Sequence, residues 1–175
     1  MMYRKATMND CRAVYDLICD MEDKSLPYHD FERIFSGQLD NENYYCLICQ
    51  SEAMDRVSQT EDQDRVYCSV NDTNDGSVIG FLNLRFEDQL HHAGRIAEIM
   101  EFVVDAEYRN KGAGKDILRE AKEVAREHGC IQIEVACNQL REDTHRFYLR
   151  EGMENYHYKF SMPLYGESGK NVLGR

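Results

Sequence analysis

The stretch from Arg109 to Gly114 has the residue types that bind phosphate groups through the protein backbone. It reads Arg-Asn-Lys-Gly-Ala-Gly and lies between an apolar run and a helical pattern. Glycine lets the backbone approach an anion closely and adopt conformations that other residues avoid. A helix that begins here has N–H groups without intrahelical partners and a positive dipole end. The sequence therefore predicts an anion site that needs no net positive charge on the protein.

Two common phosphate loops do not fit this stretch. A Walker loop needs glycine at the position of Arg109 and Ser or Thr at the position of Asp116. A dinucleotide fingerprint needs its third glycine at the position of Ile117. What remains is the pattern R-x-x-G-x-G. An ordinary tight turn between a strand and a helix is the alternative that these residues alone leave open.

The neighbouring elements must place this loop. Residues 94–104 are mostly apolar and predict a long, buried strand directly before it. Apolar residues then recur at helical spacing from Ile117 to His128, and Gly129 ends the helix. The pattern further along predicts a strand at 131–137, a short helix at 141–152 and a final strand at 153–162.

The N-terminal half predicts a mixture of strands and helices. A helix capped by Thr7 and one at 28–38 are expected beside strands at 1–7, 44–50, 66–70 and 77–86, with a hairpin turn at 71–76. This order predicts an α/β or α+β fold in which helices cover a mixed sheet. We expect one domain over 1–165, with 51–75 as an insertion or long loop and 166–175 as a mobile tail.

Composition limits the class of protein. The chain has 175 residues, 42% of them hydrophobic, which predicts a soluble, cytoplasmic protein that does not bind membranes. Its formal net charge of -11 predicts that it does not bind nucleic acid. Its seven cysteines show no spacing typical of a secreted disulfide framework, so reduced thiols are expected. Cys46 and Cys49 form a C-x-x-C on a predicted strand without a second pair, so metal ligation is not expected there.

The combination of these motifs resembles the GNAT acyltransferases. The run AEIMEFVVDAEYRNKGAG is similar to their strand and pyrophosphate loop, and Asn138 followed by THRFYLREGM is similar to their later strand end and helix. Within that family the chain looks most like the aminoalkylphosphonate N-acetyltransferases, which share LHH before the long strand, the paired glutamates and HRFYLREG. Residues 51–75 depart from this pattern.

The resemblance implies a fold and a cosubstrate. It implies the GNAT fold, with a central, mixed, mostly antiparallel twisted sheet of six to seven strands and about four helices. It also implies direct transfer of an acetyl group from acetyl-CoA to a primary amine of a small molecule. The residues expected to bind acetyl-CoA are Phe102, Val103, Val104, Arg109, Asn110, Lys111, Gly112, Ala113, Gly114, Lys115 and Asn138.

Three side chains are candidates for proton transfer. Glu98 stands where histone-type members of the family carry a base, and Glu101 is the alternative. Strand alternation puts these two on opposite faces unless a bulge intervenes, so only one is expected to face the site. Tyr148 is the expected acid, because a phenol with a pKa of about 10 is protonated at neutral pH. A backbone N–H near Val103 or Val104 would polarise the carbonyl.

Several residues are available to bind the acceptor of the acetyl group. His91, His92, Arg85, Arg141 and Arg146 are the residues available to bind an acidic group, as a phosphonate would need, and Glu101 is a further substrate-binding candidate. The alternatives are a polycationic amine, a protein or peptide amine, or a non-catalytic module that binds acyl-CoA. Glu98 and Tyr148 together favour an enzyme. A divalent metal and a homodimer are left open, although no ligand spacing indicates a metal.

Overall fold

The computed structural model describes residues 1–52 and 76–164. The chain divides into two compact parts, Met1–Val135 and Ala136–Arg175, which are described separately below. The predicted strand at 66–70, almost all of the predicted turn at 71–76 and the predicted tail at 166–175 lie outside the described residues. Within the described ranges, no helix is both long and apolar enough to cross a bilayer.

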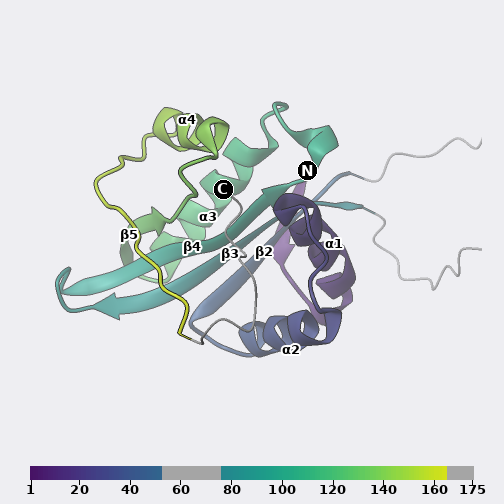
Figure 1. Cartoon of the computed structure of the whole chain (residues 1–175), viewed down its shortest axis with the longest axis horizontal. Coiled ribbons are helices and arrows are strands. Elements are labelled where there is room, and N and C mark those ends of the chain that lie inside the picture. The colour runs from purple at the N-terminus through teal and green to yellow at the C-terminus, as the bar shows by residue number, and fades with distance from the viewer. Residues whose placement is uncertain (53–75, 165–175) are drawn as a thin grey trace, which may run out of the picture. The chain divides into compact units, whose positions relative to one another are not determined.

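The first part is built on a sheet of five strands among the described residues (Figure 1). They are β1 (Met2–Lys5), β2 (Tyr44–Gln50), β3 (Val78–Gln89), β4 (Gly94–Val104) and β5 (Cys130–Val135), in that spatial order. Successive strands are antiparallel from β1 to β4, whereas β5 runs parallel to β4. The mixed sheet of the predicted fold is therefore confirmed.

Helices cover both faces of this sheet. The pair α1 (Cys11–Glu22) and α2 (Tyr28–Leu39) packs on one face, where Val14, Phe35, Phe81 and Val103 belong to one buried cluster. Helix α3 (Ala113–Glu127) packs on the other face (Figure 1). Gly80 of β3 allows its close approach, because a Cβ there would lie 2.5 Å from Ile117 Cδ1. Two short 3-10 helices, Met8–Asp10 and Ala106–Tyr108, precede α1 and the glycine loop.

The second part contains α4 (Glu142–Arg150), which ends before Gly152 at a φ of 86°. The prediction of a final strand at 153–162 is wrong, since these residues have no regular secondary structure. An alternating pattern of apolar side chains is not sufficient for a strand, because the backbone also needs a neighbouring segment with which to form hydrogen bonds. Tyr156, Tyr158 and Phe160 are all exposed. The expected six to seven strands are thereby corrected to five in the described residues.

Candidate active site

The glycine loop joins β4 to α3 through a left-handed backbone. Asn110 has a φ of 60° and Gly112 a φ of 91°, and Gly112 is the N-cap residue of α3. As a glycine, Gly112 has no side chain with which to cap the N–H groups of the first turn of α3. Arg109 Nε instead donates to the carbonyl oxygen of Val104 at 2.9 Å, which ties the loop to the end of β4. The open helix end has the geometry that binds an anion through N–H groups.

Other predicted cofactor residues surround this loop. Lys115 is exposed in the first turn of α3, and Lys111 lies over the ring of Tyr108, with Nζ 5.7 Å from the centroid.

The strand that leads to the loop, β4, continues past the end of its parallel neighbour β5. β5 pairs with β4 only from Arg95 to Ile99, and β4 extends to Val104. The far end of β4 is thus where an extended ligand could run along the strand toward the loop.

A bulge in β4 changes which face its glutamates share. Glu98 lies opposite Arg85 and Glu101 lies opposite Asn83, so the pairing shifts by one residue at Met100. Directly opposed residues of an antiparallel pair point to the same face. Arg85 and Asn83 are two residues apart on β3, so both glutamates point to the face covered by α1 and α2. The expectation that only one glutamate would face that side is corrected.

The two glutamates nevertheless differ in their surroundings. Glu98 accepts a hydrogen bond from Arg85 Nη2 at 2.5 Å, and Arg85 also pairs with Glu87. Glu101 accepts a hydrogen bond from Asn83 Nδ2 at 2.8 Å and has no ion-pair partner among the described residues. Burial raises the pKa of Glu101, although the Asn83 hydrogen bond acts in the opposite direction. Burial therefore makes Glu101 a stronger base than an exposed carboxylate.

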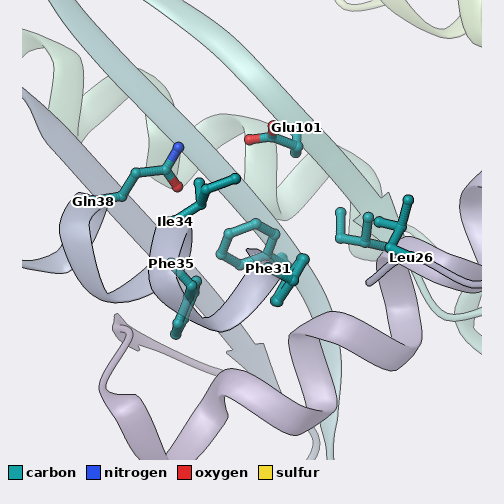
Figure 2. A pocket seen from close by; sticks show the side chains of 8 residues that line it. Leu26, Phe31, Ile34, Phe35, Gln38 and Glu101 are labelled. Carbon is teal, nitrogen blue, oxygen red and sulfur yellow. The ribbon is translucent and has the colours of Figure 1, made fainter. Parts of the chain in front are cut away.

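Glu101 lines a cavity of about 170 Å³ between the helices and the sheet (Figure 2). Figure 2 shows the carboxylate reaching in from β4, with Ile34 and Gln38 of α2 nearby. Among the described residues that line the cavity, Glu101 is the only one with a titratable side chain. The others are Ile18, Leu26, Phe31, Ile34, Phe35, Gln38 and Phe81. A mostly apolar cavity with one half-buried carboxylate is suited to binding a basic nitrogen.

The histidines lie at the other end of β4 from the glycine loop. His91 and His92 are in the turn between β3 and β4, with ring centroids 4.2 Å apart, and His92 Nε2 is 3.7 Å from Glu134 Oε1. Neither lines the cavity. Within the described residues, no group of three or more His, Cys, Asp and Glu side chains is placed to hold a metal ion.

The second part carries the remaining candidates. Tyr148 is buried in α4, and burial raises the pKa of its phenol above the ordinary value. Arg146 forms ion pairs with Glu142 and Asp143 on the surface of the same helix. The Asn138 side chain accepts a hydrogen bond from the backbone N–H of Leu140 at 2.9 Å, which supports the turn before α4.

Asn83 and Gln38 are parts of the site that the sequence pattern did not identify. Asn83 is the single polar residue inside the run VIGFLNL. Such a position is a signal in itself, because a buried amide needs partners. Gln38 gives no such signal, since it lies near the end of an amphipathic helix where a polar residue is ordinary.

Known proteins share this combination of strand, loop and helices. Residues 13–153 match the model of the Acetyltransferase (GNAT) family. The chain belongs to the GNAT acetyltransferase family. An aminoalkylphosphonate N-acetyltransferase from Salmonella typhimurium is 33% identical over 162 residues, which cover 92% of this chain and 90% of the relative.

Solved structures agree with the GNAT fold. A transcriptional regulator from Bacillus halodurans C-125 superposes with a TM-score of 0.73 at 21% identity, over 93% of this chain and 99% of that one. A glucosamine-6-phosphate N-acetyltransferase from Arabidopsis thaliana superposes with a TM-score of 0.67 at 18% identity, over 93% and 97%. The chain is thus an acetyltransferase by family, and these structures support its fold alone.

Proposed function

We propose that the enzyme transfers an acetyl group from acetyl-CoA directly to a primary amine of a small molecule. The observation that carries this proposal is the half-buried Glu101 carboxylate, which lines a cavity and lies on the strand that leads into the glycine loop. Acetyl transfer to an amine needs a proton acceptor next to the nitrogen and a site for the cosubstrate's phosphates. β4 and the loop that follows it supply both on one continuous stretch of chain.

Each bond and proton that changes in the reaction can be matched to a group of the protein or its substrates. The amine nitrogen forms a bond to the acetyl carbon, and the bond from that carbon to sulfur breaks. Glu101 takes the proton that the nitrogen loses, either directly or through water. Tyr148 supplies a proton to the leaving thiolate, and its raised pKa keeps the phenol protonated at neutral pH. A backbone N–H near Val103 or Val104 would stabilise charge on the carbonyl oxygen.

We expect Gly112→Ala to weaken acetyl-CoA binding at least tenfold. Alanine is strained at a φ of 91°, so the loop must change its backbone to accommodate a Cβ, although no described residue lies within 4 Å of that Cβ position. Gly129→Ala is the matched control, because Gly129 has a φ of 73° and similarly open space at the other end of α3. Calorimetry with acetyl-CoA measures both. Equal affinities for the two folded variants would rule out the loop as the binding site.

We further propose that an aminoalkylphosphonate is the first acceptor to test. The 33% identical relative acetylates compounds of that name. Arg85 points to the same face as Glu101 and carries a buried Nε without a hydrogen bond among the described residues. The competing observation is the acidity of this surface, where Glu87 and Glu98 already pair with Arg85. That acidity favours a cationic acceptor instead.

One assay separates the two acceptor classes. We expect 1-aminoethylphosphonate to be acetylated faster than spermidine or an aminoglycoside, as measured by release of free thiol from acetyl-CoA. Each amine is assayed with and without a divalent metal, since a metal would help to bind the phosphonate. Turnover of the polycations alone would reject the phosphonate and leave the acetyltransferase reaction intact.

A further inference from the structure

We propose that Asn83 is a positioning residue whose side-chain amide, held by Gln38 and Cys46, orients the Glu101 carboxylate at the cavity. The proposal rests on the proposed function, in which Glu101 accepts the proton of the amine. It adds a residue from β3 that touches neither substrate in our scheme. Asn83 would act on the reaction only through Glu101.

The position of Asn83 is costly unless all its polar atoms are bonded. Its side chain is 0% exposed, in the centre of a sheet whose neighbouring residues are apolar. Nδ2 donates to Glu101 Oε2 at 2.8 Å and to Gln38 Oε1 at 3.1 Å. The Cys46 thiol donates to Oδ1 at a sulfur–oxygen distance of 3.5 Å. Both polar atoms of the amide therefore have partners, and these partners favour one orientation of the side chain.

The hydrogen-bond partners of the Asn83 amide determine its orientation. They are side chains from α2, β2 and β4, whereas a purely structural Asn can satisfy itself with neighbouring backbone. Cys46 is itself buried, and burial raises the pKa of its thiol to about 12, so it remains a proton donor. The thiol thereby fixes which end of the amide faces Glu101. The N–H end, which a carboxylate needs, points at the cavity.

The charges around Glu101 are few. From β3 and β4, the Glu98 and Arg85 pair shares its face, and from β2 the neutral Cys46 thiol approaches. The cavity residues of α1 and α2 are uncharged. An N–H donated to a carboxylate stabilises its charged form, so loss of the amide makes Glu101 hold its proton more tightly. The side chain would also lose the hydrogen bond that limits its rotation.

The test is the pH dependence of Asn83→Leu, which keeps the side-chain volume and removes the amide. We expect kcat at neutral pH to fall about tenfold or more while the Michaelis constant for acetyl-CoA stays within about twofold. The acid limb of kcat/KM should move upward by about one pH unit, so activity partly returns at alkaline pH. A merely structural residue would lower activity equally at every pH.

Gln50→Leu is the matched control. Gln50 is also a buried polar side chain, 5% exposed, on the adjacent strand β2, and it bonds to Arg4 and to the carbonyl oxygen of Gly76. Its loss should lower stability without moving the acid limb. If Asn83→Leu does not fold, Asn83→Ser removes the amide with less change in shape and is read in the same way.

A second readout does not depend on turnover. The pKa of Glu101, followed by carbon-detected NMR of its carboxylate in the protein without substrates, should rise in Asn83→Leu and stay unchanged in Gln50→Leu. An unchanged Glu101 pKa and an unchanged acid limb would overturn the proposal. A wild-type enzyme that acetylates no amine would instead contradict the proposed function, and the NMR titration would still decide whether Asn83 controls Glu101.

Discussion

Replacing Glu101 by Gln is expected to lower kcat by about 10²–10⁴-fold, with little change in the Michaelis constant for acetyl-CoA. Glutamine keeps the size of the side chain and removes the proton acceptor. Burial raises the pKa of Glu101, so the carboxylate is a stronger base than an exposed one. The fraction of enzyme with a protonated Glu101 increases as pH falls, so wild-type kcat/KM should decline at low pH. Steady-state kinetics across the pH range measure both effects.

The matched control is Glu98→Gln, three residues away on the same face of the same strand. Glu98 is bonded to Arg85, and this variant leaves that arginine with Glu87 as its partner. We expect its kcat to remain much closer to wild type than that of Glu101→Gln. The reverse order of the two variants would identify Glu98 as the base, in agreement with its place in histone-type members of the family. Equal, small losses would indicate that neither glutamate transfers the proton.

Tyr148→Phe is expected to lower kcat by about 10²–10⁴-fold as well, because it removes the proton that the leaving thiolate receives. Phenylalanine keeps the ring in its buried place on α4. The raised pKa of Tyr148 means that the phenol holds its proton beyond its ordinary range. A basic limb below about pH 10 in the wild type would therefore belong to another group.

The neighbouring Phe147→Leu provides a control for packing on the same helix. It changes an aromatic side chain next to Tyr148 without altering a proton donor. Both variants should unfold at similar temperatures, and only Tyr148→Phe should lose turnover. If kcat of Tyr148→Phe stays within about twofold of wild type, water or another side chain protonates the thiolate.

Local patterns were sufficient for the loop and for most elements. Gly112 and the apolar stripe of α3 identify a strand–loop–helix unit because turn chemistry and helical period depend on nearby residues only. Local patterns could not predict the cavity, because it is formed by residues far apart in the sequence, such as Phe31 of α2, Phe81 of β3 and Glu101 of β4. The placement of both glutamates on one face depends on a register shift that no alternation pattern encodes.

The error at 153–162 has a related cause. Tyr156, Tyr158 and Phe160 alternate as a strand should, but pairing is a property of two segments. A single sequence shows the pattern of one segment and not whether a partner is in register with it. The same limit applies to Asn83, whose three hydrogen-bond partners come from three different elements.

The extra residue at Met100 makes β4 two strand segments that are out of phase with each other. Both segments pair with β3, the first from Gly94 to Ile99 and the second from Glu101 to Val104, whereas only the first also pairs with β5. A deletion of one residue here would restore simple alternation and turn one of the two glutamates toward α3. A relative should therefore be compared by the spacing Glu-x-x-Glu and the distance from it to the loop. A lone glutamate aligned at either position would not show that the same carboxylate reaches the cavity.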